Sequence, residues 1–175
     1  MRYYVNMTIT SPQVNYGILS LDQSTAQIGH SSWINSKLES WGNFKPDWPH
    51  LDFVRSFIKD YCQQFRAEGL APCVVIEDIY MLNVVTFKQL AILRGHIEAA
   101  TYDCGAELQV ITANSALFAL TGMKSSPRNP IKRPERKRLI IEAASKLTGA
   151  TIQEDAADSI AIGLAYLKQK QPIPS

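Results

Sequence analysis

Four acidic residues stand at positions where their carboxylates could work together. Asp22 ends the apolar stretch "YGILSLD", and Glu77 ends the apolar run "CVVIE". Asp155 and Asp158 are three residues apart in "EDAADSIAIGLAYL", so they share one face of a helix. Carboxylate oxygens are ligands for Mg²⁺ or Mn²⁺, and two such ions about 3.5 to 4 Å apart can activate water and stabilise the leaving oxygen of a phosphodiester. If the strands that end at Asp22 and Glu77 are neighbours, the four acids predict a divalent-metal site.

Each acid also has a simpler explanation. Asp22 could accept hydrogen bonds from backbone N–H groups of the turn that follows it. Asp155 could stabilise a helix start, where the helix dipole favours acids, and Glu77 and Asp78 could belong to a surface loop. Gathered carboxylates raise one another's pKa and are costly to bury without a compensating cation. The metal hypothesis therefore depends on the combination of the four acids and on no single one.

The elements that must hold these acids follow from the hydrophobic pattern. Apolar, β-branched runs predict strands over residues 16–22, 28–34, 73–80 and 108–112, with a short strand within 35–50. Apolar residues at spacings of three and four predict helices over 48–66, 86–103, 114–121, 135–148 and 154–168, the first capped by Asp47. A hairpin followed by alternating helices and strands is typical of an α/β fold. We expect a mixed five-stranded sheet, antiparallel on one side and parallel on the other, with helices on both faces.

A second candidate feature is a run of basic residues. Seven of the eighteen Lys and Arg residues fall between Met123 and Arg138, against one acid, Glu135, although the net charge of the chain is only +2. Lys and Arg contacts to phosphate dominate the affinity of proteins for nucleic acids, so the run predicts a phosphate-binding surface; a solvated face would have the same composition. Arg94, on the second predicted helix, could likewise face phosphate or pair with an acid. The seven basic residues are Lys124, Arg128, Lys132, Arg133, Arg136, Lys137 and Arg138.

The composition is that of a single folded domain. The chain has 175 residues, of which 46% are hydrophobic and 19% charged, without low-complexity tracts. We expect one domain over residues 15–170, an N-terminal extension over 1–14 and a frayed tail over 171–175. No stretch has the pattern of a secretory signal or a membrane span, and the three cysteines lie singly in apolar segments. These observations predict a soluble protein of a reducing compartment, cytoplasmic in its own cell or in a host cell if it is viral, with no membrane partner.

Taken together, the motifs resemble a known family. The order of "GILSLDQS", "VVIEDIYM", "LRGHIEAA" and "DAADSIAIGLAYL" is similar to that of the RuvC-type Holliday junction resolvases, which have the RNase H-like nuclease fold. The resemblance covers residues 16–168. It implies an RNase H-like fold and a metal-dependent endonuclease that acts as a homodimer and makes paired symmetric nicks across a four-way DNA junction. It also implies that the catalytic and metal-binding acids are Asp22, Glu77, Asp155 and Asp158.

The resemblance extends to residues that would meet DNA. Two positions after the acidic pair, Tyr80 matches a position that contacts bases near the junction centre in the family, although a tyrosine that closes the strand against the core is an alternative. Two departures accompany this match. The segment Gln23-Ser24-Thr25 stands where the family commonly has a glycine, and Leu117 stands where family members carry a lysine. Lys124 or the basic residues at 136–138 could supply that charge instead.

Three other functions are compatible with parts of the sequence. A nuclease of the same fold could act on RNA or on other branched DNA, and an inert module could bind nucleic acid without cleaving it. The presence of all four acids argues against the inert module. The turn "LDQSTAQIG" also resembles the first hairpin of ATP-binding proteins of the actin and sugar-kinase type. Those proteins need two such domains and glycine-rich phosphate loops, which 175 residues cannot hold.

Overall fold

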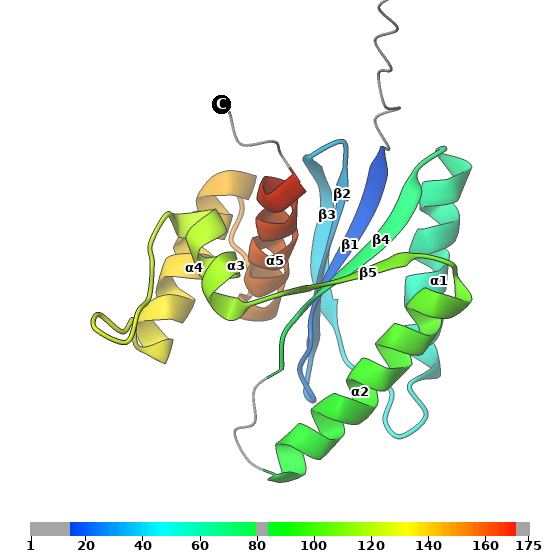
Figure 1. The fold of residues 1–175 in the computed structure, drawn as a ribbon, viewed down its shortest axis with the longest axis horizontal. Coiled ribbons are helices and arrows are strands. Elements are labelled where there is room, and N and C mark those ends of the chain that lie inside the picture. The colour runs from blue at the N-terminus through cyan, green and yellow to red at the C-terminus, as the bar shows by residue number, and fades with distance from the viewer. Residues whose placement is uncertain (1–14, 80–83, 171–175) are drawn as a thin grey trace, which may run out of the picture.

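The structure, a computed structural model, describes residues 15–79 and 84–170. Strands and helices follow one another in the order that the hydrophobic pattern predicts (Figure 1). The first two strands coincide with their predicted ranges, and most other bounds differ by a few residues. The elements are β1 (Tyr16–Asp22), β2 (Ile28–Ile34), β3 (Lys37–Phe44), α1 (Asp52–Ala67), β4 (Ala71–Glu77), α2 (Val84–Asp103), β5 (Glu107–Ile111), α3 (Ala113–Thr121), α4 (Arg133–Thr148) and α5 (Glu154–Lys170).

The start of α1 differs from its prediction. Asp47 is not the helix cap, because α1 begins after Leu51, whose φ of 57° lies in the left-handed region. Asp47 still supports the helix start, since its Oδ2 accepts a hydrogen bond from the Phe53 N–H at 2.8 Å. A carboxylate several residues upstream therefore satisfies one of the N–H groups that the first turn leaves without an intrahelical partner.

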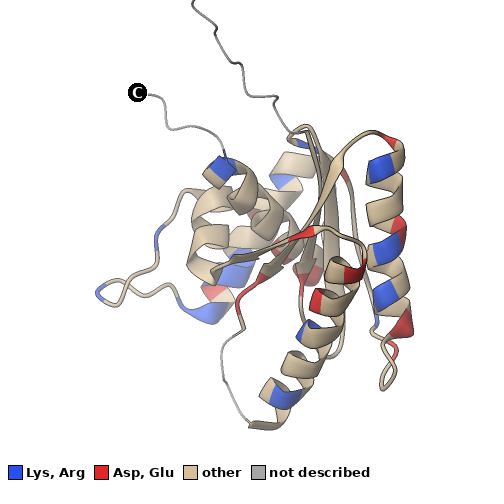
Figure 2. Cartoon of the chain, turned by 45° about the vertical axis from the view of Figure 1, so that its right-hand side comes forward, with Lys and Arg blue, Asp and Glu red and all other residues tan. Residues whose placement is uncertain are grey.

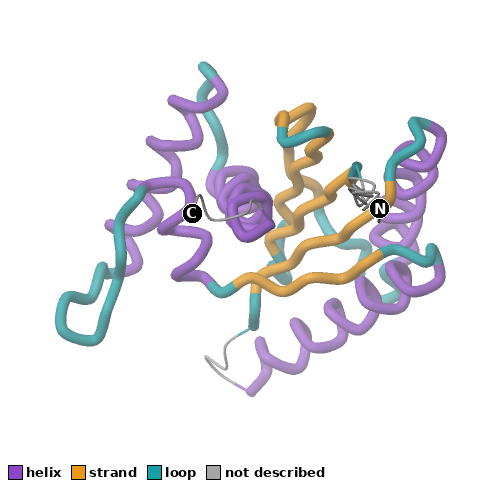
Figure 3. Tube along the Cα trace, turned by 45° about the horizontal axis from the view of Figure 1, so that its top comes forward, coloured by secondary structure: helices purple, strands orange, loops and turns teal. Residues whose placement is uncertain are grey.

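The strands form one mixed sheet in the order β3-β2-β1-β4-β5. β2 pairs antiparallel with both β1 and β3, whereas β4 pairs parallel with both β1 and β5. Helices α1 and α2 cover one face of the sheet, and α3, α4 and α5 cover the other (Figure 1, Figure 3). The predicted five-stranded α/β architecture is confirmed, including its antiparallel hairpin and its parallel strands.

The alternation of side chains along β1 divides the core into two layers. Leu19 is buried in the layer with α1 and α2, whereas Ile18 is buried in the layer with α5. Buried hydroxyl groups connect the second layer: the Oγ atoms of Ser20 and Ser31 are 2.6 Å apart, and Ser31 Oγ donates to the backbone oxygen of Ser159 at 3.1 Å. These hydrogen bonds tie α5 to the centre of β1 and β2.

Glycines allow α5 to lie directly against the strands. A Cβ on Gly29 in β2 would lie 1.8 Å from the backbone oxygen of Asp155, and a Cβ on Gly163 in α5 would lie 2.2 Å from Trp33 Nε1. Neither position can take a larger residue unless the backbone or a packed side chain moves. Gly29 is the register partner of Asp22, so this close contact brings the first turn of α5 beside the end of β1.

The cysteines are part of the core, as the sequence predicts. All three are free thiols; Cys62 and Cys73 are buried and Cys104 is half-buried. Burial raises the pKa of Cys62 to about 12 and that of Cys73 to about 11. Within residues 15–79 and 84–170, no helix has the length and apolarity that crossing a bilayer requires.

Candidate active site

Two parallel strands bring Asp22 and Glu77 to the same edge of the sheet. β1 and β4 lie side by side, and their last register pair is Leu21 with Ile76. Each strand ends one residue later, so the two acidic residues leave the sheet next to each other. The sequence reasoning assumed that these strands are neighbours, and the structure confirms it.

The end of β4 is held from both sides. The Gln23 side chain donates a hydrogen bond from Nε2 to the backbone oxygen of Glu77 at 2.9 Å. On the other side, the Asp78 N–H donates to the backbone oxygen of Ile111 at 2.9 Å. The peptide that follows Glu77 is therefore fixed between the ends of β1 and β5, and Gln23 contributes directly to this arrangement.

Asp155 and Asp158 come from the first turns of α5. Acids in the first turn are favourable because they face the positive end of the helix dipole, and Glu154 and Asp155 both occupy it. The contact at Gly29 holds this turn against β2. Figure 2 shows acidic segments at the ends of the central strands, close to basic segments of α4. Three elements thus deliver acidic side chains to one edge of the sheet.

The predicted acids at this edge of the sheet repel one another electrostatically. Burial is the main cause that raises the pKa of Asp22 well above its usual value, and Asp158, Glu77 and Asp155 raise it further, in that order. Burial followed by repulsion from Glu77 raises the pKa of Asp158 to about 7, although the positive charge of Arg136 opposes the shift. Carboxylates with such shifts cost free energy to keep ionised at neutral pH, and a nearby cation lowers that cost.

The remaining two acids follow the same rule to a smaller extent. Burial raises the pKa of Glu77, and the neighbouring Arg136 guanidinium opposes this rise. Burial also raises the pKa of Asp155, with a further contribution from Glu154. The predicted acids therefore share one partly desolvated, negatively charged environment, for which we use the name acid cluster: Asp22, Glu77, Asp155 and Asp158.

Two basic residues of α4 reach this cluster, and a third does not. Arg136 Nη2 lies 3.5 Å from Glu77 Oε1 and donates to the backbone oxygen of Ala113 at 2.6 Å. Lys137 forms an ion pair with Glu154. Arg138 instead pairs with Glu142 at 2.8 Å, one turn further along its own helix. The basic run thus divides into residues beside the acids and residues away from them.

The rest of the basic run lies on the surface. We use the name basic loop for four exposed residues, of which the first three lie between α3 and α4 and the fourth is the first residue of α4: Lys124, Arg128, Lys132 and Arg133. Lys124 Nζ lies 4.9 Å from the centre of the Phe118 ring. Among the described residues, none of the four has a carboxylate within ion-pair distance. The segment between α3 and α4 extends away from the rest of the molecule (Figure 2), so these four charges are accessible to an anionic partner.

Three further predicted positions have definite outcomes. Arg94 pairs with Glu98 at 2.7 Å and with Asp78 at 3.5 Å, which matches the alternative that it pairs with acids. Leu117, where a lysine was expected from the resemblance, is fully buried in the core and supplies no charge. The basic side chains beside the acids come from α4 instead. Tyr80 lies outside the described residues.

Sequence reasoning missed two members of this site. Glu154 directly precedes Asp155 and contributes to the raised pKa of Asp22. Gln23 directly follows Asp22 and bonds to the Glu77 backbone. Adjacency in sequence to a predicted acid was the available signal, but it could not reveal that Glu154 acts electrostatically on Asp22 or that the Gln23 side chain crosses to β4.

The acid cluster supplies the right kind of donor for a divalent cation. Hard carboxylate oxygens from Asp22, Glu77, Asp155 and Asp158 suit Mg²⁺ or Mn²⁺, and their raised pKa values mark a deficit of positive charge. Gln23 Oε1 adds a buried oxygen without a hydrogen-bond partner in the part of the chain that the structure describes. Over the same residues, no three His, Cys, Asp or Glu side chains are arranged to hold an ion. The chemistry of the donors fits a cation, and the carboxylates would have to converge further to bind it.

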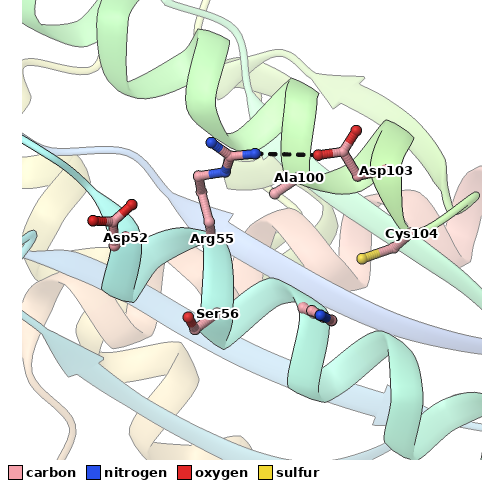
Figure 4. Close-up of a pocket in the computed structure, with 7 residues that line it drawn as sticks. Asp52, Arg55, Ser56, Ala100, Asp103 and Cys104 are labelled. Carbon is pink, nitrogen blue, oxygen red and sulfur yellow. Dashed lines mark hydrogen bonds and ion pairs between the residues drawn. The ribbon is translucent and has the colours of Figure 1, made fainter.

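A pocket of about 350 Å³ lies elsewhere, between α1 and α2 (Figure 4). Its lining combines acidic and basic side chains with the Cys104 thiol, and Arg55 Nη2 is 3.2 Å from Asp103 Oδ2 across it. These two helices cover the face of the sheet opposite α5. The pocket is therefore separate from the acid cluster.

Comparison with known proteins identifies the fold. No protein-family model matches the chain, and no curated protein matches it in sequence. The structure of T. thermophilus RuvC in complex with a Holliday junction substrate matches with a TM-score of 0.65 at 13% identity, covering 89% of this chain and 96% of that chain. A second Thermus thermophilus RuvC structure matches with a TM-score of 0.60 at 14% identity, covering 87% and 96%. The chain has an RNase H-like α/β fold, as the sequence predicted.

Proposed function

We propose that this chain is a metal-dependent endonuclease that resolves four-way DNA junctions by paired symmetric nicks. The observation that carries the proposal is the acid cluster, in which acids from β4 and α5 raise the pKa of Asp22 at the end of β1, at one edge of an RNase H-like sheet. Without a ligand, this arrangement would carry a large desolvation and repulsion cost. A cation-binding site explains why the acids are gathered.

In this proposal Asp22, Glu77, Asp155 and Asp158 hold Mg²⁺ or Mn²⁺. The bound ions supply water activation and stabilisation of the leaving oxygen during phosphodiester hydrolysis. The protein contributes the orientation of the acids, through the parallel register of β1 with β4 and the contact of α5 with Gly29. Basic side chains beside the acids would bind the substrate phosphate and hold it near them.

Arg136 and Lys137 are the proposed phosphate contacts closest to the reaction. Both already compensate acids at the site, Arg136 at Glu77 and Lys137 at Glu154. When cations bind the carboxylates, these two side chains are released to pair with a phosphate, and a guanidinium can do so with two parallel hydrogen bonds. The exposed basic loop is proposed to contact the DNA backbone at a greater distance from the acids.

Branched DNA is the proposed substrate because of the structural likeness and the charge distribution. The similar RuvC protein was solved in complex with a Holliday junction substrate, and it shares the fold over most of both chains. The basic residues of α4 and of the basic loop extend from the acid cluster to the tip of the segment between α3 and α4. A four-way junction, whose arms diverge from one centre, can contact the acid cluster and the basic loop at the same time. We propose that Tyr80, which follows the last residue of β4 by three positions in the sequence, contacts bases near that centre.

A homodimer is proposed because paired nicks need two sites and because α2 exposes apolar residues that no described residue covers. Val85, Ile92 and Tyr102 lie on one side of α2, together with the exposed Lys88, and are 70%, 51% and 85% exposed. Gly95 lies between them, and a Cβ built on it meets nothing within 4 Å. Glycine in a helix interior costs about 0.5 to 1 kcal/mol relative to alanine, and no packing within the described monomer explains it. A second copy whose α2 crosses at Gly95 would cover the face.

The proposal is tested by comparing cleavage of a labelled four-way DNA junction with cleavage of a linear duplex of the same sequence. We expect symmetric nicks in the junction with Mg²⁺ or Mn²⁺, no nicks in the duplex, and no activity with chelator. Cleavage of an RNA substrate in place of the junction would assign a different RNase H-like nuclease. Salt-sensitive junction binding without cleavage under any metal would assign an inert binding module.

A further inference from the structure

Gln23 connects the ends of the two strands that carry Asp22 and Glu77. It follows the last residue of β1, and its side chain crosses to β4, where Nε2 donates to the Glu77 backbone oxygen at 2.9 Å. The register pairs of β1 and β4 end at Leu21 and Ile76. Gln23 therefore extends the contact between the two strands past their ends, at the level of Asp22 and Glu77.

The other end of the same amide is unusual. Oε1 of Gln23 is buried and accepts no hydrogen bond from any described residue. The orientation of the amide is not ambiguous, because the backbone oxygen of Glu77 can only accept, so the nitrogen must face it. A buried acceptor without a donor is destabilising, and an apolar side chain of the same length would avoid this cost.

When the acids are ionised, the form in which they bind a cation, the charged groups of the site leave this oxygen without a donor. Ionised carboxylates such as those of Asp22 and Glu77 only accept hydrogen bonds. The two basic side chains at the site are engaged with other groups: Arg136 with Glu77 and the Ala113 backbone, and Lys137 with Glu154. In the cation-bound form, water is the donor that remains for this oxygen.

We propose that Gln23 is a positioning residue of the acid cluster with two functions. Its nitrogen fixes the Glu77 peptide beside Asp22, and its oxygen accepts a hydrogen bond from the hydration shell of the divalent cation that the acids bind. This inference rests on the proposed metal-dependent function. Groups that hydrogen-bond around a metal site in this way orient its ligands, and their removal typically weakens metal binding about 10- to 100-fold.

The test is a calorimetric titration of Mn²⁺ into the full chain without DNA, so that the readout is binding and not activity. Gln23→Met removes both amide functions at constant length, and we expect Mn²⁺ binding at least about 10-fold weaker. Gln23→Glu loses the donor but keeps an oxygen and adds charge, and we expect binding at least as tight as in the wild type, because cation affinity rises with ligand charge. Gln27→Met, in the same β1–β2 connection, is the matched control and should bind as the wild type does.

Melting temperatures in chelator accompany these titrations. We expect Gln23→Met to melt close to the wild type, since it loses one hydrogen bond together with one unpaired buried acceptor. Added Mn²⁺ should raise the melting temperature of Gln23→Met less than that of Gln23→Glu, because stabilisation follows affinity. This second comparison decides the question if Gln23→Met itself proves poorly folded, because each variant is then measured against its own metal-free state.

Each alternative outcome removes a defined part of the inference. Wild-type affinity in Gln23→Met would overturn it. Equal weakening in Gln23→Met and Gln23→Glu would overturn the function of the oxygen and reduce Gln23 to a clamp on the Glu77 peptide. If the wild-type chain binds no Mn²⁺, the proposed metal-dependent function fails as well. A wild type that binds Mn²⁺ beside an unaffected Gln23→Met would overturn the Gln23 inference alone.

Discussion

At the scale of single residues, the acid cluster opposes folding and favours metal binding. Burial and repulsion raise the pKa of Asp22 well above its usual value, so keeping this carboxylate ionised at neutral pH costs free energy in the metal-free protein. The same cost becomes an advantage when a cation enters, because the charges that repel one another then attract it. Stability without metal and affinity for metal are therefore expected to change in opposite directions.

Asp22→Asn separates these two quantities. The amide keeps the size of the side chain and removes its charge, so we expect loss of junction cleavage while junction binding is kept or strengthened. In chelator the variant should be more stable than the wild type, and a gain of about 1 kcal/mol would raise the melting temperature by about 2 to 4 °C in a chain of this size. Thermal melts with and without Mg²⁺ and a cleavage assay measure both effects. Full cleavage by Asp22→Asn would contradict its assignment to the metal site.

Arg136 and Arg138 provide a matched pair for the proposed phosphate contact. They are two residues apart on α4, but Arg136 reaches Glu77 whereas Arg138 pairs with Glu142 away from the acids. We expect Arg136→Ala to reduce the rate of junction cleavage about 100-fold, the scale of losing one charge-stabilising group. Arg138→Ala should stay close to the wild-type rate. Single-turnover rates at saturating protein measure the difference, and equal effects in the two variants would place the phosphate contact elsewhere.

At the scale of elements, α5 is the part of the fold that completes the site. The carboxylates of Asp155 and Asp158 reach Asp22 only because β2 presents a glycine to the helix backbone. Buried hydroxyl groups of Ser20 and Ser31 fix the same helix further along. A change that moves the start of α5 is therefore expected to affect both stability and cleavage.

Gly29→Ala tests this contact between β2 and α5. The added Cβ would overlap the backbone oxygen of Asp155, which cannot move without the helix. We expect a loss of about 1 to 3 kcal/mol in the free energy of unfolding, as for other overpacked sites, together with weaker Mn²⁺ binding. Gly42→Ala in β3 is the control, since its Cβ would meet the end of the His30 side chain at 2.9 Å. Denaturant unfolding that finds Gly29→Ala no less stable than Gly42→Ala would contradict this account of α5.

The basic loop makes a prediction about salt dependence. Its four exposed basic residues have no carboxylate partner within the described chain, so their charges are available for phosphate. If they bind DNA, alanine substitution should reduce the slope of log affinity against log salt by about 0.9 for each phosphate that is no longer neutralised. Lys37→Ala and Lys59→Ala, on β3 and α1, are the controls and should leave the slope unchanged. Junction binding measured at several salt concentrations gives both slopes, and an unchanged slope in the loop variant would exclude the proposed role of this loop.

The elements also show what could be read from the sequence. β1, β2 and β4 were predictable because they are buried runs with clear ends, and two of these ends carry the acids. The extent of β3 was not, because all its side chains are half-buried or exposed, and its residue types do not follow the alternation of its burial. The sequence also could not predict the different partners of Arg136 and Arg138, because the packing of α4 decides which of the two side chains faces Glu77.

At the scale of the whole molecule, the two faces of the sheet serve different purposes. The layer with α3, α4 and α5 supports the acid cluster and the basic residues, whereas α2 in the other layer has apolar residues on both its buried and its exposed sides. A helix that is apolar on both sides is usually covered on both. The proposed dimer places this second cover on the face away from α5.

The proposed dimer interface is tested by two substitutions of equal exposure. Ile92 on α2 and Leu147 on α4 are both 51% exposed in the monomer. A charge buried without a partner strongly disfavours an interface, so Ile92→Asp should be a monomer at concentrations where the wild type and Leu147→Asp are dimers. Light scattering coupled to size exclusion measures the masses. On a four-way junction the Ile92→Asp monomer should still nick, but the two nicks should become independent events, because each active site then acts alone. A wild-type monomer, or a dimer that survives Ile92→Asp, would move the pairing of the two sites away from α2.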